Sequence, residues 1–203
     1  MLKLFVVLFC SVFICGRYQP KTLAIFYGYP NEVGSEKLNK YDLIVLGEGL
    51  EEEKHPDRAY LEKLNKNRIY GYVDSIKKTA KDSIMKWKET GVMGVMLDDF
   101  GFDFGMEREK QNELVNFSHK IGMKVMVNAW EPEDVFEGDN KINFLKDDIY
   151  LIEGRLDKFD YLKKRNIKLA LICLADCDKC QKLANKEEIY AFGCAKDNYM
   201  MIK

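Results

Sequence analysis

The run Gly91-Val-Met-Gly-Val-Met-Leu-Asp-Asp-Phe-Gly101 decides the fold of this chain. An uncharged stretch leads without a break into two adjacent acids, Asp98 and Asp99. A short apolar run bounded by glycines is typical of a strand that is buried on both faces, as strands of parallel sheets are. We therefore expect a central strand over Gly94–Asp99 whose end carries two carboxylates.

Similar apolar or β-branched runs lie on both sides of this strand. They are Leu23–Tyr29, Tyr41–Gly47, Arg68–Asp74, Lys124–Asn128, Asp148–Glu153, Lys168–Leu174 and Ile189–Gly193. Polar segments with helical spacing separate most of them, at Asp57–Asn65, Ser75–Glu89, Glu107–Ile121, Pro132–Leu145, Leu156–Arg165 and Asp176–Lys186. Strands that alternate with helices indicate βαβ units and a parallel sheet. Eight such strands predict an α/β fold, a compact (β/α)8 TIM barrel.

The chain is short for this fold. It has 203 residues in all, whereas roughly 250 are usual for such a barrel. We therefore expect short loops and a reduced or missing last helix, because Pro30–Lys40 is rich in turn residues and only Asp197–Lys203 follow the last strand. An open doubly wound sheet is the alternative, although no Gly-rich phosphate loop follows the first strand.

The N-terminal segment differs from the rest of the chain. Met1-Leu-Lys3 precedes the apolar run Leu4–Cys15, which suits a secretory signal and is shorter than the 18 or so residues of a spanning helix. We expect residues 1–19 to be a signal peptide or an uncleaved N-terminal anchor, and residues 20–203 to form a single (β/α)8 barrel domain. The protein is then secreted or extracytoplasmic, and its only contact with a membrane is an uncleaved N-terminal segment.

The cysteines, the net charge and the histidines limit which cofactors and partners this chain could have. Four cysteines lie outside the leader, at positions 173, 177, 180 and 194. In an oxidising compartment they allow three disulfide pairings, and their CxxxCxxC spacing also matches an iron–sulfur motif, which is the weaker interpretation for an exported chain. A formal charge of −1 argues against nucleic acid as a partner, and two distant histidines argue against a histidine zinc site. We expect a monomer with no cofactor and no metal.

In a parallel barrel the reaction site forms where the strands end. Here the strand ends and the residues after them carry acids, aromatic rings and an amide: Tyr27, Tyr72, Asp74, Asp99, Asn128, Trp130, Glu131 and Arg155. Aromatic faces stack on the apolar face of a pyranose, carboxylates and amides bind its hydroxyls, and grouped carboxylates attract a cationic amino sugar. We therefore predict that these residues bind a polysaccharide.

Two carboxylates are candidates for catalysis. Asp98 ends the run described first, and Glu153 ends the run Tyr150-Leu-Ile152. Two acids held by rigid strands across a barrel mouth are what glycoside hydrolysis requires, one to protonate the leaving oxygen and one to attack or to activate water. An acid at a strand end also serves often as a local cap, and Asp74 could cap a helix that starts at Ser75. Glu131 competes with Glu153 for the catalytic role.

The chain also resembles a known family. The chain is similar to glycoside hydrolase family 114 and to the barrel domains of Pel-type exopolysaccharide proteins in four stretches: Phe26-Tyr-Gly-Tyr-Pro30, Leu38-Asn-Lys-Tyr-Asp-Leu-Ile-Val45 with the YDLIVL second strand, Gly94-Val-Met-Leu-Asp-Asp-Phe-Gly101 and Val127-Asn128. The resemblance implies a (β/α)8 endo-acting hydrolase of α-1,4-linked galactosamine polymers. It implies Asp98 as nucleophile and Glu153 as acid/base, with the order of the two roles open.

Two other functions remain as alternatives. The first is a carbohydrate-binding or cell-surface barrel without turnover; the third strand, Tyr72-Val-Asp74, lacks the serine-rich end usual in the family. The second is a metal-dependent enzyme that holds a divalent ion with Asp98, Asp99 and Glu153.

Overall fold

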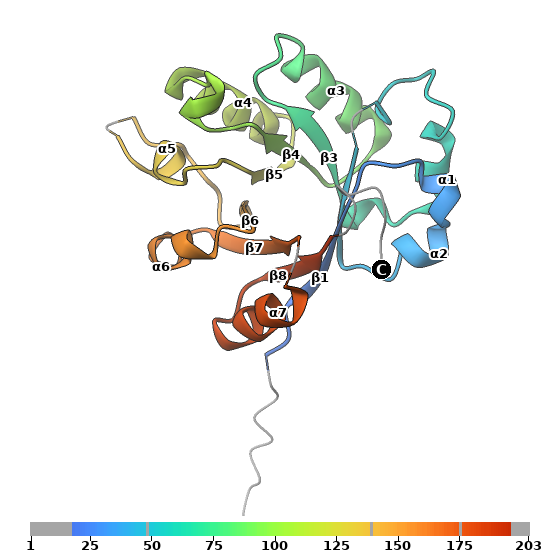
Figure 1. Ribbon diagram of the computed structural model, residues 1–203. Coiled ribbons are helices and arrows are strands. Elements are labelled where there is room, and N and C mark those ends of the chain that lie inside the picture. The colour runs from blue at the N-terminus through green and yellow to red at the C-terminus, as the bar shows by residue number, and fades with distance from the viewer. Residues whose placement is uncertain (1–17, 48, 139, 175, 196–203) are drawn as a thin grey trace, which may run out of the picture.

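The computed structural model describes residues 18–47, 49–138, 140–174 and 176–195. Its strands are parallel and close into one barrel in chain order, β1 to β8 (Figure 1). They are β1 Lys21–Phe26, β2 Leu43–Leu46, β3 Ile69–Asp74, β4 Gly94–Asp98, β5 Lys124–Val127, β6 Ile149–Glu153, β7 Lys168–Cys173 and β8 Ala191–Cys194. Each overlaps a predicted strand, so the (β/α)8 barrel is confirmed and the open doubly wound sheet is wrong.

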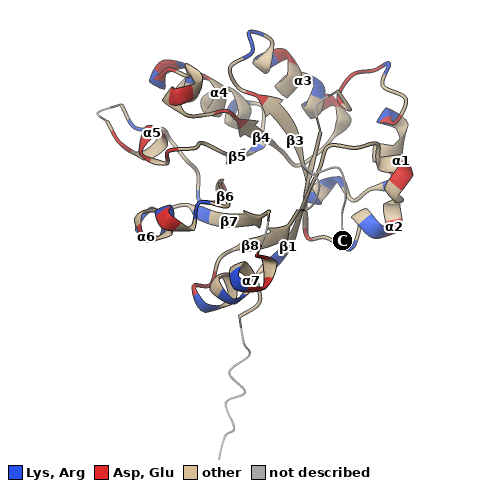
Figure 2. Cartoon of the chain, in the orientation of Figure 1, with Lys and Arg blue, Asp and Glu red and all other residues tan. Residues whose placement is uncertain are grey.

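The helical layer is thin. Three helices have ten residues or more, α3 Ala80–Thr90, α4 Arg108–Lys120 and α7 Cys177–Lys186. The short α-helices are α1 Pro30–Val33, α2 Ser35–Leu38, α5 Glu133–Phe136 and α6 Phe159–Leu162, and the 3-10 turns are η1 Arg58–Lys63, η2 Lys66–Arg68, η3 Phe102–Phe104 and η4 Leu156–Lys158. Acidic and basic residues are interspersed over these outer elements, while the strands are mostly uncharged (Figure 2).

Some predicted helices were wrong in extent. Asp57–Asn65 forms only the 3-10 turn Arg58–Lys63, which ends at Leu64 because that residue adopts an extended conformation. Pro132–Leu145 is helical only in α5, since Glu137 already adopts an extended conformation and Gly138 follows it with a left-handed φ of 100°. Residues 197–203, where the last helix was expected to be reduced or missing, lie outside the described residues.

Alternation along the strands separates two apolar cores. Side chains that include Ile44, Val95 and Ile152 pack between the barrel and its helices. The second core fills the barrel interior and includes Val45, Met96, Met126 and Leu151. Because side chains two residues apart on a strand share a face, the residues that follow this inner core by two positions also face the barrel axis.

Trp87 on α3 shows how the two layers fit together. Its indole is fully buried over Gly71 of β3, where an added Cβ would lie 2.0 Å from the ring. The indole N–H donates to the carbonyl of Tyr72 at 2.9 Å. Only glycine at position 71 leaves room for this contact, which fixes α3 against the strand that carries Tyr72 and Asp74.

The strands of the barrel are joined unequally. The β3–β4 and β6–β7 ladders pair five residues on each side. The β5–β6 ladder pairs only Met126 with Ile149 and Val127 with Tyr150 in the described chain. The β8–β1 ladder is equally short, with Lys21 paired to Ala191 and Thr22 to Phe192. Closure of the barrel therefore rests on two short ladders.

Two disulfides fasten the C-terminal part of the barrel. Cys173 at the end of β7 is bonded to Cys180 on α7, and Cys177 at the start of α7 is bonded to Cys194 at the end of β8. This is one of the three pairings that the sequence allowed, and it leaves none of these thiolates for an iron–sulfur cluster. Among the described helices, none is long and apolar enough to cross a membrane. Residues 1–17 of the predicted leader, which was expected to span residues 1–19, lie outside the described residues.

Candidate functional site

The C-terminal mouth of the barrel gathers the predicted carboxylates. Asp98 follows Met96 by two residues on β4, and Glu153 follows Leu151 by two residues on β6. Asp74 and Asn128 continue the inward-facing positions of β3 and β5 in the same way. Strand alternation therefore places these four side chains at one mouth, facing the barrel axis.

Asp98 is the most strongly perturbed carboxyl of this group. Burial, next the charge of Asp99 and last that of Glu153 together raise its pKa to about 7. The Asp99 N–H and the Tyr72 hydroxyl both donate to the Asp98 carboxylate and oppose that rise, since donors stabilise the charged form. At neutral pH this carboxyl therefore exchanges a proton readily, a property that acid–base and nucleophilic residues share.

Glu153 lies close enough to act on its acidic neighbours. It is the last residue of β6, paired in register with Ile172, and it is partly buried. Its charge raises the pKa of both Asp98 and Asp99. The two predicted catalytic acids thus belong to one electrostatic cluster.

Asp99 and Asp74 enlarge this cluster. Burial, followed by the charges of Asp74, Asp103 and Glu153, raises the pKa of Asp99. Asp99 also has a left-handed φ of 52°, an uncommon conformation outside glycine that occurs where a chain turns sharply at a functional site. The mouth therefore concentrates negative charge directly after β3, β4 and β6.

Asp74 does not cap a helix in the way that the sequence suggested. Helix α3 begins at Ala80, beyond the reach of this side chain. The Asp74 carboxylate instead accepts from the N–H of Ile76 at 3.2 Å and lies 3.5 Å from the Lys77 ammonium. It stabilises the turn after β3 and keeps its place at the mouth.

Aromatic and amide groups lie beside the acids. The rings of Tyr27 and Tyr72 meet edge to face, with centroids 5.2 Å apart. The Asn128 side-chain amide donates to the carbonyl of Leu151 at 3.1 Å, which links β5 to β6. Tyr27 and Tyr72 thus form an aromatic wall next to Asp98. The Asn128 amide also has a structural role, because its hydrogen bond connects two strands.

Trp130 and Arg155 form a second wall, on the Glu153 side. The Trp130 ring is 52% exposed, and the Arg155 guanidinium lies 4.7 Å from its centroid. Both residues line one small pocket together with Asn128 and Glu153. An exposed indole beside a catalytic candidate fits the predicted role of Trp130 as a platform for a sugar ring.

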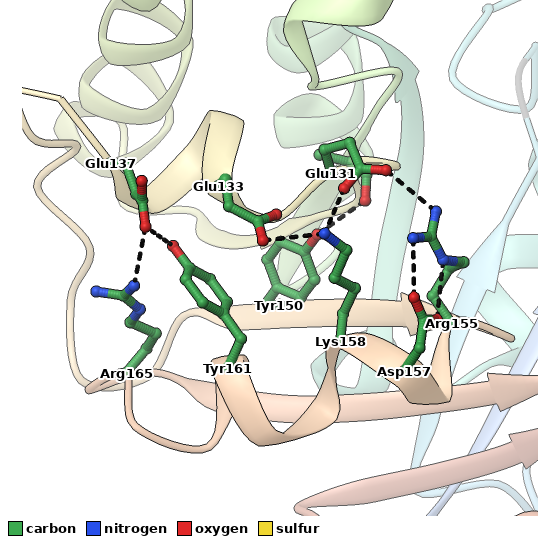
Figure 3. Close-up of polar contacts among 10 residues, drawn as sticks. Glu131, Glu133, Glu137, Tyr150, Arg155, Asp157, Lys158, Tyr161 and Arg165 are labelled. Carbon is green, nitrogen blue, oxygen red and sulfur yellow. Dashed lines mark hydrogen bonds and ion pairs between the residues drawn. The ribbon is translucent and has the colours of Figure 1, made fainter.

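Ion pairs hold this second wall in place (Figure 3). Glu131 lies 3.3 Å from Arg155 and 2.6 Å from Lys158, and Lys158 also reaches Glu133 at 2.9 Å. Hydrogen bonding from Lys158 lowers the pKa of Glu131. Arg155 also binds the Asp157 carboxylate, at 3.0 Å. Glu131 therefore lies in a surface ion-pair network, and Arg155 is paired both with Glu131 and with Asp157.

Sequence reasoning missed Lys158. It lines the same pocket as Glu153 and joins η4 to the loop after β5. Nothing in the local sequence signals this role, because its partners lie more than twenty residues earlier and meet it only through the fold. In the described parts of the chain, no group of three or more His, Cys, Asp or Glu residues is arranged to hold a metal ion.

The fold defines a class, the parallel (β/α)8 barrels that carry their chemistry at the C-terminal mouth. No protein-family model matches this sequence, and no curated protein matches it. Solved structures do match its fold. The glycoside hydrolase domain of PelA from Pseudomonas aeruginosa superposes with a TM-score of 0.56 at 14% identity, over 91% of this chain and 98% of that one.

Two further solved structures are similar to this chain in fold. A single-residue variant of the same PelA domain gives a TM-score of 0.56 at 13% identity, over 90% of this chain and 97% of that one. A candidate phosphonomutase from Burkholderia cenocepacia gives 0.54 at 9% identity, over 86% of each chain. At these identities the likeness establishes the barrel fold. It agrees with the family resemblance of the sequence, which pointed to the barrel domain of Pel-type proteins.

Proposed function

We propose that this protein is a glycoside hydrolase that cleaves α-1,4-linked galactosamine-type polysaccharide with Asp98 and Glu153. The observation that carries the proposal is the placement of these two acids at the ends of β4 and β6, on inward-facing positions, with the charge of Glu153 acting on Asp98. Two carboxylates across one mouth are the groups that this reaction needs. The resemblance to PelA-type barrels supports the same reaction class.

The contacts of Asp98 support its assignment as nucleophile. A nucleophilic carboxyl must be ionised and held in one orientation, and two donors, the Tyr72 hydroxyl and the Asp99 N–H, stabilise its charged form. In the first step a carboxylate oxygen of Asp98 bonds to the anomeric carbon while Glu153 protonates the departing glycosidic oxygen. In the second step Glu153 takes a proton from water, whose oxygen displaces Asp98 and frees the sugar.

The acidic cluster supports a cationic substrate. Asp74, Asp98, Asp99 and Glu153 lie around one mouth, and each adds to an attraction for an ammonium group. Because salt screens such attraction, KM for a de-N-acetylated galactosamine polymer should rise with ionic strength, while KM for a fully N-acetylated polymer should change little.

The test is the release of reducing ends from de-N-acetylated α-1,4-galactosaminan by three variants. Asp98→Asn and Glu153→Gln should each lower kcat by about a thousandfold or more. Asp82→Asn, which changes an exposed acid on α3 outside the mouth, is the matched control and should keep most of the rate. If the wild type binds the polymer without cleaving it, the protein is a carbohydrate-binding barrel and the hydrolase proposal fails.

We also propose that the protein is exported, with residues 1–19 as signal or anchor. The two disulfides support this proposal, because such bonds persist mainly in oxidising compartments. Fractionation of cells followed by alkylation of free thiols tests it. A cytosolic protein with free thiols at Cys173 and Cys177 would contradict it.

A further inference from the structure

A second cavity opens on the β1–β2 side of the mouth, away from Trp130. It has a volume of about 110 Å³ and is lined by Tyr27, Gly28, Tyr29, Gly47, Leu50 and His55. The Tyr29 and His55 rings are stacked, with centroids 5.4 Å apart and planes 24° apart, and Tyr29 is 47% exposed. Neither Tyr29 nor His55 has a part in the proposed chemistry.

The backbone is shaped to keep this cavity open. A Cβ at Gly47 would lie 2.8 Å from the Tyr27 Cα, so glycine is required where β2 ends against β1. The loop after β2 is tied down by Asp57, a buried residue whose carboxylate accepts from the N–H of Asn31 at 2.9 Å. His55 is thereby held against Tyr29 by structure that exists without a ligand, which lowers the entropic cost of binding one.

The two ring nitrogens of His55 have different hydrogen-bonding roles. Its Nδ1 accepts from the N–H of Asp57 at 3.1 Å, so in the neutral ring Nε2 carries the proton. Among the residues that the structure describes, none accepts a hydrogen bond from this Nε2. A stacked aromatic pair that presents a ring face and an N–H donor suits a pyranose, which has an apolar C–H face and hydroxyl oxygens.

The cavity connects to the proposed reaction centre through aromatic contacts. Tyr27 lines it and meets Tyr72 at 5.2 Å, and Tyr72 donates to Asp98. In a closed barrel of eight strands in chain order, β1 lies opposite β5, the strand that Trp130 follows. A chain of sugars that crosses the mouth from Trp130 past the carboxylates therefore arrives at Tyr29.

We propose that Tyr29 and His55 form a binding subsite for one sugar unit of the polysaccharide, remote from the bond that is cleaved. The proposal rests on the proposed function, since it assumes that the mouth binds a polymer. A remote subsite contributes binding energy that only a longer chain can use. Discrimination between polymer and short oligosaccharide thus depends on Tyr29 and His55.

The test uses the fact that the chain has two histidines, His55 and His119. In the Asp98→Asn protein, which binds without turnover, the imidazole Cε1–H signals are followed by NMR while partly N-acetylated α-1,4-galactosamine oligosaccharides are added. The His55 signal should move and the His119 signal should not, because His119 lies at the other end of the barrel beside Asp148. A His119→Gln variant assigns the two signals.

A second arm measures affinity through the fluorescence of Trp130. Tyr29→Ala should weaken binding of long oligosaccharides by about tenfold and leave that of disaccharides nearly unchanged. The control is Leu145→Ala, because Leu145 is similarly exposed, at 55%, but precedes β6 at the opposite end of the barrel.

The outcomes separate the two proposals. If oligosaccharides bind with an unmoved His55 signal and an unchanged affinity in Tyr29→Ala, the subsite is wrong and the proposed function stands. If they do not bind at all, both are wrong.

Discussion

The Tyr72 hydroxyl donates a hydrogen bond to the Asp98 carboxylate, and this contact joins the aromatic wall of the mouth to its most perturbed acid. Tyr72 and Asp98 lie on neighbouring strands whose last residues, Asp74 and Asp98, pair in register. The backbone of Tyr72 is fixed in turn by Trp87. The orientation of Asp98 therefore depends on a buried helix contact outside the mouth.

The pH dependence of catalysis should report this hydrogen bond. With Asp98 as nucleophile, the acidic limb of the kcat/KM profile should rise with pH through about 7, because protonated Asp98 cannot attack. Tyr72→Phe removes a donor that lowers the pKa of Asp98, so the rise should move upward by about one pH unit. Tyr161→Phe removes a hydroxyl of α6 that donates to Glu137, outside the mouth, and should leave the profile unchanged. A wild-type profile that falls through neutral pH would instead exchange the roles of Asp98 and Glu153.

The stability of the fold should also depend on pH through the raised pKa of Asp98. The pKa of Asp98 is about 7 in the fold, against about 3.9 in an unfolded chain. A carboxyl whose pKa is raised by folding stabilises the fold below about pH 4, and this contribution is lost as pH rises through about 7. The free energy of unfolding of Asp98→Asn, relative to that of the wild type, should therefore increase from pH 5 to pH 8, by more than about 1 kcal/mol. Urea unfolding at pH 5 and at pH 8 measures the gain, and Asp82→Asn on α3, which changes an exposed acid outside the mouth, should show none.

A second buried carboxylate should matter for stability alone. Asp148 is 1% exposed and accepts from the N–H groups of Val125 and Leu145 at 3.2 and 2.6 Å, and it lies 3.0 Å from His119. Asp148→Ala leaves these buried donors unpaired and should lower the free energy of unfolding by about 2–4 kcal/mol. The neighbouring Asp147→Ala breaks only an exposed pair with Lys168 and should leave the urea midpoint unchanged. Equal effects of the two substitutions would contradict this account.

The disulfides should contribute unequally. Cys177–Cys194 closes a loop of sequence separation 17 and Cys173–Cys180 one of separation 7. Because a longer loop loses more entropy when it is closed, the double variant Cys177→Ser/Cys194→Ser should lose about 2–4 kcal/mol of unfolding free energy. Cys173→Ser/Cys180→Ser should lose less. Peptide mapping of the oxidised protein checks the pairing, and a Cys173–Cys177 link would refute it.

The strands and their acidic ends could be predicted from the sequence because both depend on local pattern. The run before Asp98 is apolar throughout, and alternation along it decides which way the carboxylate faces. The helix predicted over Pro132–Leu145 was too long, because its periodicity is weak and the chain already turns to an extended conformation at Glu137, ahead of Gly138. The ion pairs of Glu131 with Arg155 and Lys158 could not be predicted, since they join residues more than twenty positions apart through loop shapes that no local pattern specifies.

The two short ladders of the barrel divide it into two arcs, β1–β5 and β6–β8. Asp98 belongs to the first arc and Glu153 to the second. The gap between two such acids separates retaining from inverting glycosidases, and here that gap spans the joint between β5 and β6. The side chains of Asn128, Glu131 and Lys158 brace this joint. For the proposed reaction, the separation of the two acids, which decides the anomeric configuration of the product, therefore depends on how β5 and β6 are joined.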